Sequence, residues 1–414
     1  MIICKKQVII NISVREKQLF SDNYQERTKI MANRFILNET SYFGAGARET
    51  LAEEAKARGF KKVLFVTDKT LLECGVAGKV SEVLDKAGVP YETYSDIKAN
   101  PTVKNVQDGV AVYKSSGADA IVAVGGGSVM DTAKGIGIII ANPEYSDVVS
   151  LEGVAPTKNK SVPIIALPTT SGTAAEVTIN YVITDEANKK KMVCVDPHDI
   201  PVVAIVDSDL MMGMPKGLCA ATGMDALTHA IEGYITLGAW EMSDMVELRA
   251  IELIHESLYD SVKGDAKARE TMALAQYVAG MGFSNVGLGI VHSMAHPLGA
   301  FYDTPHGVAN ALLLPYVLEY NAESPAKPKF RAIAKAMGVK HTKKMTDDEC
   351  VAAAIEAVRE LSKSIDIPQK LSEIGVKEED LQALSVAAFN DVCTGGNPRP
   401  TSAEEILEIY KKAY

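Results

Sequence analysis

Residues 118–134 read ADAIVAVGGGSVMDTAK, an apolar run that leads through three glycines into a helix-like segment. The run is almost continuously apolar, which predicts a strand buried on both faces of a sheet. Residues 62–67 form a second such run, and helical patterns at residues 80–87 and 103–116 lie between the two. Strands that alternate with helices predict an α/β domain with a mostly parallel, Rossmann-like sheet.

The pattern changes along the chain. Further strands are predicted at residues 34–37, 163–167, 181–184, 192–195 and 203–206, with a hairpin around residues 185–188. After Met214 and Pro215, helical periodicity dominates, at residues 225–234, 243–262, 266–280 and 352–364. We therefore predict an N-terminal extension (1–30) that is disordered or reflects an upstream start, an α/β domain (31–212) and an all-helical domain (213–414).

Composition excludes several classes of protein. The 414 residues are 47% hydrophobic and 23% charged, which argues against intrinsic disorder. The net charge of −10 argues against a nucleic-acid partner. No apolar run reaches the roughly 18 to 20 residues of a membrane span. Six scattered cysteines without a C-x-x-C pair indicate reduced thiols, so we expect a soluble cytoplasmic protein without a membrane partner.

The glycine loop, residues 125–128, offers free backbone N–H groups at a helix start, which suits a pyrophosphate. Its spacing is not that of G-x-G-x-x-G, so a tight structural turn is the alternative. Asp68 follows a predicted strand and could bind an adenosine ribose, favouring NAD over NADP, or could cap a helix before Leu71. Residues 168–173, PTTSGT, add hydroxyl and backbone donors. Together these segments predict a cleft for NAD.

Histidines and one aspartate recur at helical spacing. Asp225 and His229 are four residues apart, as are His292 and His296, and His306 follows ten residues later. The i, i+4 spacing places each pair on one helix face. Imidazoles with one carboxylate and no thiolate suit Fe²⁺ or Zn²⁺. Three protein ligands suffice for a catalytic metal, so the spacing alone leaves open which histidines bind it.

From residue 31 to its end, the chain resembles the iron-dependent alcohol dehydrogenases, whose architecture is like that of dehydroquinate synthase. The resemblance is carried by residues 125–128 (GGGS), 168–176 (PTTSGTAAE), 223–232 (GMDALTHAIE) and 287–299 (GLGIVHSMAHPLG). Within the family, the chain is most similar to the branch that interconverts lactaldehyde and propane-1,2-diol. Val129 and Met130 depart from the more polar pair of that branch, and residues 1–30 lie outside the family pattern.

The resemblance implies a set of site residues. The metal, Fe²⁺ or alternatively Zn²⁺, would be held by Asp225, His229, His292 and His306, and His296 would transfer protons. The NAD site would comprise Asp68, Gly126, Gly127, Ser128, Thr169, Thr170, Thr178, Val182 and Lys191. Asn180, Phe283 and Cys393 would border a small aldehyde or alcohol substrate. The resemblance also implies a homodimer in which the strand near residues 34–37 crosses to the partner, and a role in fucose and rhamnose catabolism.

Three alternatives remain at this point. A broader alcohol, butanol or glycerol dehydrogenase would use the same parts. A lyase like dehydroquinate synthase would need Lys and Arg near the metal, and the segments around His229, His292 and His306 contain none. A catalytically silent assembly subunit would not need all four ligands.

Overall fold

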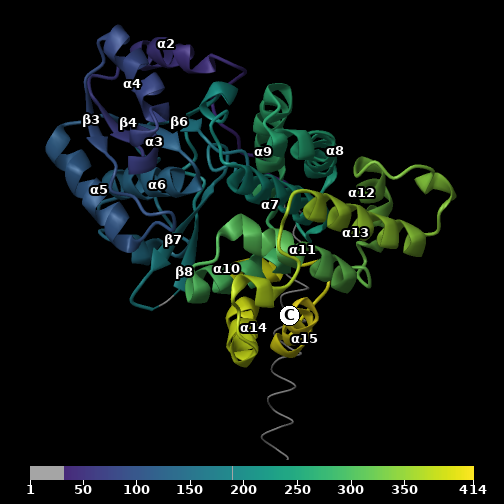
Figure 1. Ribbon diagram of the computed structural model, residues 1–414. Coiled ribbons are helices and arrows are strands. Elements are labelled where there is room, and N and C mark those ends of the chain that lie inside the picture. Colours follow the sequence, from purple (N-terminus) through teal and green to yellow (C-terminus); the bar gives the residue numbers. More distant parts are fainter. Residues whose placement is uncertain (1–31, 189) are drawn as a thin grey trace, which may run out of the picture. The chain divides into compact units, whose positions relative to one another are not determined.

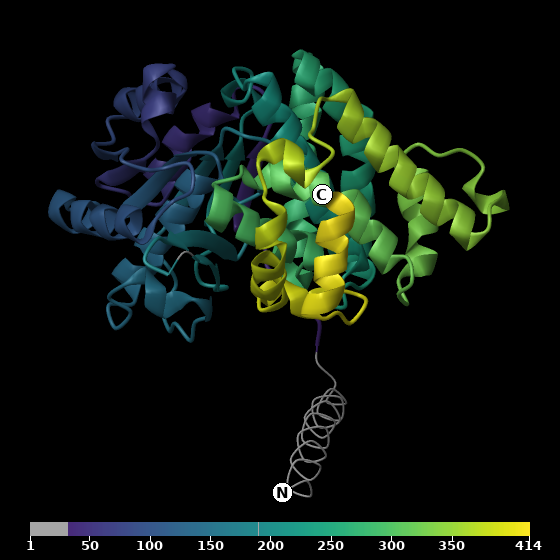
Figure 2. The same cartoon turned by 60° about the horizontal axis from the view of Figure 1, so that its bottom comes forward.

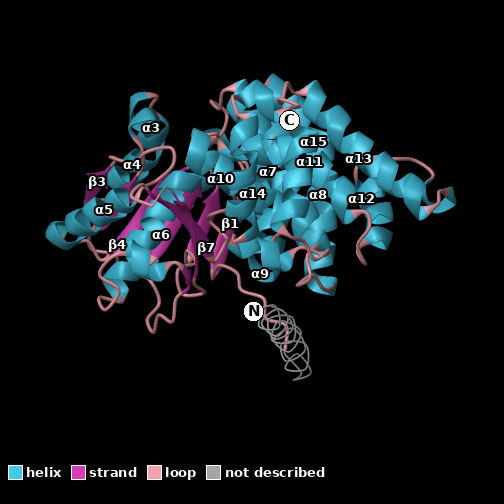
Figure 3. Cartoon of the chain, turned by 90° about the horizontal axis from the view of Figure 1, so that it is seen from below, coloured by secondary structure: helices cyan, strands magenta, loops and turns pink. Residues whose placement is uncertain are grey.

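The computed structural model describes residues 32–188 and 190–414, so the predicted extension 1–30 lies outside the described residues. Ile36–Tyr414 form one compact unit. Within this unit the strands gather in one part, and the chain after the last strand is helical (Figures 1 and 3). The predicted fold class, an α/β part followed by a helical part, is confirmed. The exact domain boundaries stay a prediction.

A six-stranded parallel sheet forms the α/β part. Its order is β1 (Thr40–Phe43), β9 (Val203–Val206), β6 (Ile164–Pro168), β4 (Ala120–Gly125), β2 (Val63–Val66) and β3 (Tyr91–Tyr94). Strand β4 is fully buried and alternates between two cores. Ile121 and Ala123 face one core, and Val122 and Val124 face the other. This double burial explains why the strand has no polar alternation.

Helices cover both faces of the sheet. The core on one face includes residues of α5 (Val103–Ser116) and α6 (Gly127–Ala141), and the opposite core includes residues of α2 (Thr50–Ala57) and α4 (Val76–Ala87). The short helix α3 (Lys69–Glu73) follows β2. A second sheet of three strands comprises β5 (Gly153–Val154), β8 (Lys190–Val195) and β7 (Asn180–Asp185). Strands β7 and β8 pair antiparallel, as the predicted hairpin requires.

Within the described chain residues 34–37 form no strand, and their predicted crossing to a partner subunit stays a prediction. The strand lies at Thr40–Phe43 instead, paired in parallel with β9. The backbone N–H of Ile36 donates to Asn285 Oδ1 at 2.7 Å, and its carbonyl accepts from Asn285 Nδ2 at 3.2 Å. A side-chain amide therefore takes the backbone groups that a neighbouring strand would have paired.

The helical part contains nine α-helices among the described residues: α7 (Lys216–Ile235), α8 (Glu241–Lys263), α9 (Ala266–Val286), α10 (Ile290–Tyr302), α11 (His306–Asn321), α12 (Phe330–Ala336), α13 (Asp347–Ser364), α14 (Leu381–Phe389) and α15 (Ala403–Ala413). The C-terminal pair α14 and α15 packs against α10 and α11 (Figure 2). Short 3-10 turns occur in both parts of the chain: η2 (Ala47–Glu49), η3 (Val148–Leu151) and η4 (Ser208–Leu210) before α7, and η5 (Lys327–Lys329), η6 (Thr342–Lys344), η7 (Leu371–Ile374), η8 (Glu378–Asp380) and η9 (Val392–Gly396) after it.

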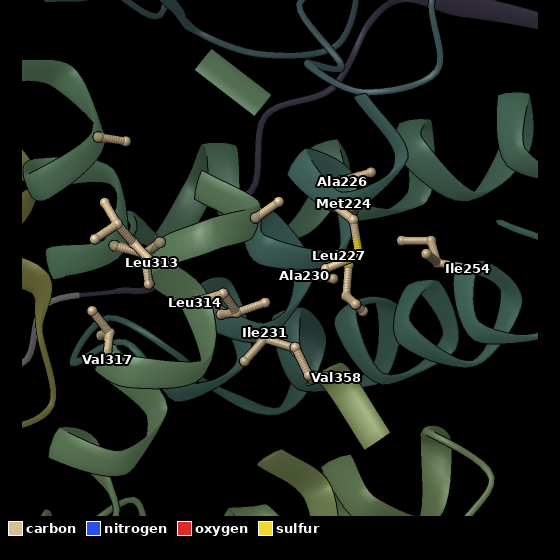
Figure 4. Packing of buried hydrophobic residues seen from close by; sticks show 14 of the residues in the cluster. Met224, Ala226, Leu227, Ala230, Ile231, Ile254, Leu313, Leu314, Val317 and Val358 are labelled. Carbon is tan, nitrogen blue, oxygen red and sulfur yellow. The ribbon is translucent and has the colours of Figure 1, made fainter. Parts of the chain in front are cut away.

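Helix α7 is the centre of this part. Met224, Leu227 and Ile231 belong to one apolar cluster with Ile254 of α8 and Leu314 of α11 (Figure 4). The helices approach so closely that a Cβ on Gly223 would lie 2.1 Å from Leu258 Cδ1. A helix that is buried on all sides has little freedom to shift, so the polar side chains it carries are held in fixed positions.

Among the described residues, no single helix is both long and apolar enough to cross a membrane. The consecutive helices α9 and α10 meet that test only as a pair, and they are bent by 102° at their junction.

Candidate metal centre and cofactor cleft

Three helices bring four potential metal ligands together. Asp225 and His229 lie one turn apart on α7, His292 lies in the first turn of α10, and His306 is the first residue of α11. One ligand atom from each lies within 4.8 Å of the others. The structure thus brings together the four residues that the resemblance implied. His296 does not belong to this group.

The three imidazoles are neutral, as metal binding requires. Burial lowers the pKa of His229 and of His292 to about 4. Burial also lowers the pKa of His306 well below its usual value, and the neighbouring His292 adds to the effect. Each ring therefore has a lone pair on one nitrogen at neutral pH.

Asn310 shows that the acceptor atoms converge. Its Nδ2 lies 2.7 Å from Asp225 Oδ1, 3.1 Å from His292 Nε2 and 3.1 Å from His306 Nε2. One NH₂ group has only two protons for these three acceptors, and His229 Nδ1 is buried without a hydrogen-bond partner. A convergent set of three nitrogens and one carboxylate with too few donors fits a divalent cation such as Fe²⁺ or Zn²⁺.

Glu232 orients one of these ligands. Its Oε2 lies 2.6 Å from His292 Nδ1, and its Oε1 accepts the backbone N–H of Val291 at 2.7 Å. Burial raises the pKa of Glu232 to about 7. The contact at Nδ1 turns Nε2 of His292 toward the other ligands. The sequence reasoning missed Glu232, although it lies three residues after His229 on the same helix face.

We expect Glu232→Gln to weaken metal binding about 10- to 100-fold, as loss of an outer partner of a ligating histidine typically does. Glutamine has one oxygen where glutamate uses two, so it cannot accept from both His292 and Val291. Competition with a chelator for Zn²⁺ measures the effect, and the exposed Glu256→Gln on α8 is the control. An unchanged affinity would show that Glu232 does not orient His292.

His296 belongs to a second polar group with Asp391 and Cys393. His296 Nδ1 lies 2.7 Å from Asp391 Oδ2, and its ring stacks on that of His306, with centroids 5.4 Å apart. Burial raises the pKa of the Cys393 thiol well above its usual value, so the side chain is an uncharged thiol. The proton-transfer candidate thus lies next to the four ligands but has its own carboxylate partner.

The predicted substrate residues lie in different places. Phe283 stacks on His229 with centroids 4.2 Å apart, directly against the four ligands. Cys393 lies in the group with His296. Asn180 begins β7, and its backbone carbonyl accepts from Lys134 Nζ at 2.8 Å. A substrate-binding role of these residues stays a prediction.

Sheet register brings the predicted cofactor loops to one edge. Val66 of β2 pairs with Ala123 of β4, and Gly125 pairs with Pro168 of β6. Asp68, the glycine loop and Thr169 follow these strand ends, and the carboxyl edge of a parallel sheet is where nucleotides bind. A Cβ on Gly126 would lie 3.2 Å from the side chain of Thr170, and one on Gly127 would lie 2.8 Å from that of Thr173. The glycines therefore let the two loops approach each other.

Two side chains of this edge have local partners. Asp68 caps α3 and accepts the N–H of Leu71 at 2.9 Å, the arrangement foreseen as the alternative to ribose binding. Ser128 donates to the carbonyl of Ala99. A cofactor role for either stays a prediction.

The remaining cofactor candidates lie around the second sheet. Thr178 accepts from Lys134 Nζ at 3.0 Å, and the N–H of Val182 donates to Asp131 Oδ2 at 3.1 Å. Lys191 Nζ donates to Asn100 Oδ1 at 2.8 Å. A Cβ on Gly299 of α10 would lie 2.9 Å from that Nζ, so Lys191 reaches from β8 to a metal-site helix.

Known proteins resemble the whole described chain. A family model for iron-containing alcohol dehydrogenases matches residues 38–208, and a model for the C-terminal part of that family matches residues 219–414. Lactaldehyde reductase of Escherichia coli K12 is 59% identical over 384 residues, which cover 93% of this chain and 100% of that protein. The NAD-dependent methanol dehydrogenase of Bacillus methanolicus is 39% identical, covering 92% and 98%. A crystal structure of 1,3-propanediol oxidoreductase superposes with a TM-score of 0.89 at 40% identity, covering 93% and 100%.

Proposed function

The chain belongs to the iron-containing alcohol dehydrogenase family, and on this premise we propose that it interconverts lactaldehyde and propane-1,2-diol with NAD(H). The 59% identity to a lactaldehyde reductase, over the full length of that protein, carries the substrate assignment. The relative named as NAD-dependent supports the cofactor. A dehydroquinate synthase-like lyase and a silent assembly subunit are not favoured by these relatives.

The residues of the candidate site have separate expected roles in this reaction. When bound, a ferrous ion held by Asp225, His229, His292 and His306 would polarise the substrate oxygen, and NADH would supply the hydride. Phe283 packs against His229 and excludes water from that side of the ligands. We infer that His296, whose ring centroid lies 5.4 Å from that of His306 and 6.2 Å from that of His292, exchanges a proton with the reacting oxygen through its Nε2.

A substrate panel tests this proposal. Protein reconstituted with Fe²⁺ or with Zn²⁺ is assayed with lactaldehyde, butanal and dihydroxyacetone, each with NADH and with NADPH. We expect kcat/KM for lactaldehyde with NADH to exceed the others by about tenfold or more, the discrimination that small differences in pocket contacts provide. Equal rates would favour the broader alcohol, butanol or glycerol dehydrogenase. Preference for NADPH would contradict the cofactor assignment.

We also propose a homodimer. Strand β1 lies at the edge of the six-stranded sheet, and Phe43 at its end is 46% exposed. An exposed edge strand with an apolar side chain is suited to pairing with another copy. Light scattering that gives the mass of a single chain would contradict this.

A cytoplasmic location and a role in fucose and rhamnose catabolism complete the proposal. The five described cysteines are all free thiols, which suits a reducing compartment. The role is tested by deleting the gene, growing the cells on fucose or rhamnose and measuring the propane-1,2-diol that they produce. Undiminished propanediol production would contradict the role.

A further inference from the structure

His296 has one hydrogen-bond partner in the part of the chain that the structure describes, and this partner is Asp391, at 2.7 Å from Nδ1. The His296 side chain is 7% exposed and that of Asp391 is 9% exposed. The imidazole ring stacks on His306 with an angle of 13° between the rings, and its centroid lies 6.2 Å from that of His292. His296 therefore turns one nitrogen toward Asp391 while its ring lies beside two of the metal-ligand candidates.

Asp391 can only accept hydrogen bonds in this place. Burial alone would raise its pKa, but His296 outweighs burial and, with the backbone N–H of Cys393, holds the pKa at about 2. The carboxylate is thus ionised, with Oδ1 accepting the N–H of Cys393 at 2.9 Å and Oδ2 facing His296. An ionised carboxylate has no proton to donate, so the proton between the two side chains must be on Nδ1 of His296.

The position of Asp391 is fixed by its neighbours. It caps η9, and the Thr394 hydroxyl oxygen in the same turn lies 2.8 Å from Ser293 Oγ of α10 and 2.8 Å from the carbonyl oxygen of Ala388, so its one proton is shared between these two contacts. Ser293 directly follows the ligand candidate His292. The turn that carries Asp391 is therefore fastened to the helix that carries His296, and the pair cannot drift apart without breaking this contact.

We propose that Asp391 is the positioning residue that holds His296 in its Nδ1–H tautomer and thereby leaves Nε2 free for the proton of the reacting oxygen. The inference rests on the proposed function for the reaction it serves. In aldehyde reduction the donor would be the imidazolium form of His296, protonated on both nitrogens: the carbonyl carbon would gain a hydride as the nicotinamide is oxidised, the oxygen would gain the Nε2 proton, and His296 would be left as the Nδ1–H tautomer. In alcohol oxidation the same proton returns to Nε2. In both directions Nδ1–H stays bonded to Asp391.

Asp391→Asn tests the proposal with a near-isosteric change. Asparagine has a single carbonyl oxygen, so if it keeps the bond to the N–H of Cys393, its NH₂ group faces Nδ1 of His296 and favours the Nε2–H tautomer. We expect ¹⁵N NMR of the metal-free and the Zn²⁺-loaded protein to show the His296 proton on Nδ1 in the wild type and on Nε2 in the variant. We expect kcat to fall about 100-fold, the usual size of a general acid–base contribution, with KM little changed.

Two variants make the result specific. Asp147→Asn removes a carboxylate at the cap of another 3-10 turn, η3, where Asp147 accepts the N–H of Ser150 at 3.1 Å. It should leave the tautomer and kcat unchanged. Asp391→Glu restores a carboxylate and should recover the Nδ1–H tautomer and part of kcat, even if asparagine loosens the turn.

The outcomes separate this inference from the proposed function. An Nε2–H tautomer in the wild type, or an unchanged tautomer in Asp391→Asn, would overturn the positioning role. If Asp391→Asn lowers kcat as strongly in a His296→Ala background as in the wild type, Asp391 does not act through His296, which also overturns it. If lactaldehyde is not turned over but the tautomer reverses as expected, the substrate assignment fails and the positioning of His296 stands.

Discussion

Asp225→Ala is expected to abolish metal retention and turnover. Asp225 supplies the only carboxylate of the four converging ligands, and its Oδ1 also accepts from Asn310 at 2.7 Å. Without Asp225 the cation would lose its one anionic ligand and keep three neutral imidazoles. We expect the loss to exceed the roughly 100-fold that removal of an outer partner causes. Elemental analysis after reconstitution with Fe²⁺ or Zn²⁺ measures metal content, and kcat is measured on the same samples.

His255→Ala is the matched control for this experiment. His255 is a half-buried histidine on α8, outside both polar groups of the site. Its removal should leave metal content and kcat unchanged. Circular dichroism of both variants separates metal loss from unfolding. Full metal content in a folded Asp225→Ala protein would show that the cluster of Asp225, His229, His292 and His306 is not the metal site.

Lys134→Met is expected to destabilise the protein by about 3–5 kcal/mol, the usual result of removing one partner from a buried charged group. The fully buried Lys134 Nζ donates to the carbonyl and the hydroxyl of Thr178, at 2.6 and 3.0 Å, and to the carbonyl of Asn180 at 2.8 Å. Asp199 Oδ1 lies 3.9 Å from the same Nζ, and neither oxygen of this buried carboxylate has a hydrogen-bond partner. The substitution leaves the acceptor oxygens of Thr178 and Asn180 buried without this donor, beside the unpaired carboxyl group of Asp199.

Urea unfolding measures this change, and Lys104→Met is the control. Lys104 is an exposed lysine on α5 that pairs with Asp108 one turn away, so its loss should leave the free energy of unfolding nearly unchanged. Thr178 and Asn180 are also predicted to contact cofactor and substrate, so KM values should rise in Lys134→Met under conditions where it is folded. A destabilisation of under about 1 kcal/mol would mean that water replaces the ammonium group at Asp199.

The sequence predicted the interior of the fold better than its edges. Strands β2, β4, β6 and β9 are buried on both faces, and such strands need continuous apolar runs that can be read without a partner. Strand β3 lies at the sheet edge with exposed Glu92 and Thr93 at its centre. It has no continuous apolar run, so the sequence did not predict it as a strand. At residues 34–37 no strand forms within the described chain, and the backbone groups of Ile36 bond to Asn285, a residue 249 positions away, a contact that no local pattern announces.

In the candidate site, too, local spacing predicted one part and contacts between distant segments decided the other. Helical spacing by itself determined that Asp225 would share a face with His229, and His292 with His296, because 3.6 residues per turn is a local property of the backbone. Spacing treated His292 and His296 alike. The family resemblance assigned them different roles, and the tertiary structure shows the contacts that set them apart: Glu232 of α7 contacts His292, and Asp391, 95 positions further along the chain, contacts His296. The chemical role of a histidine depends on what faces each ring nitrogen, and contacts of that kind form only when distant segments pack together.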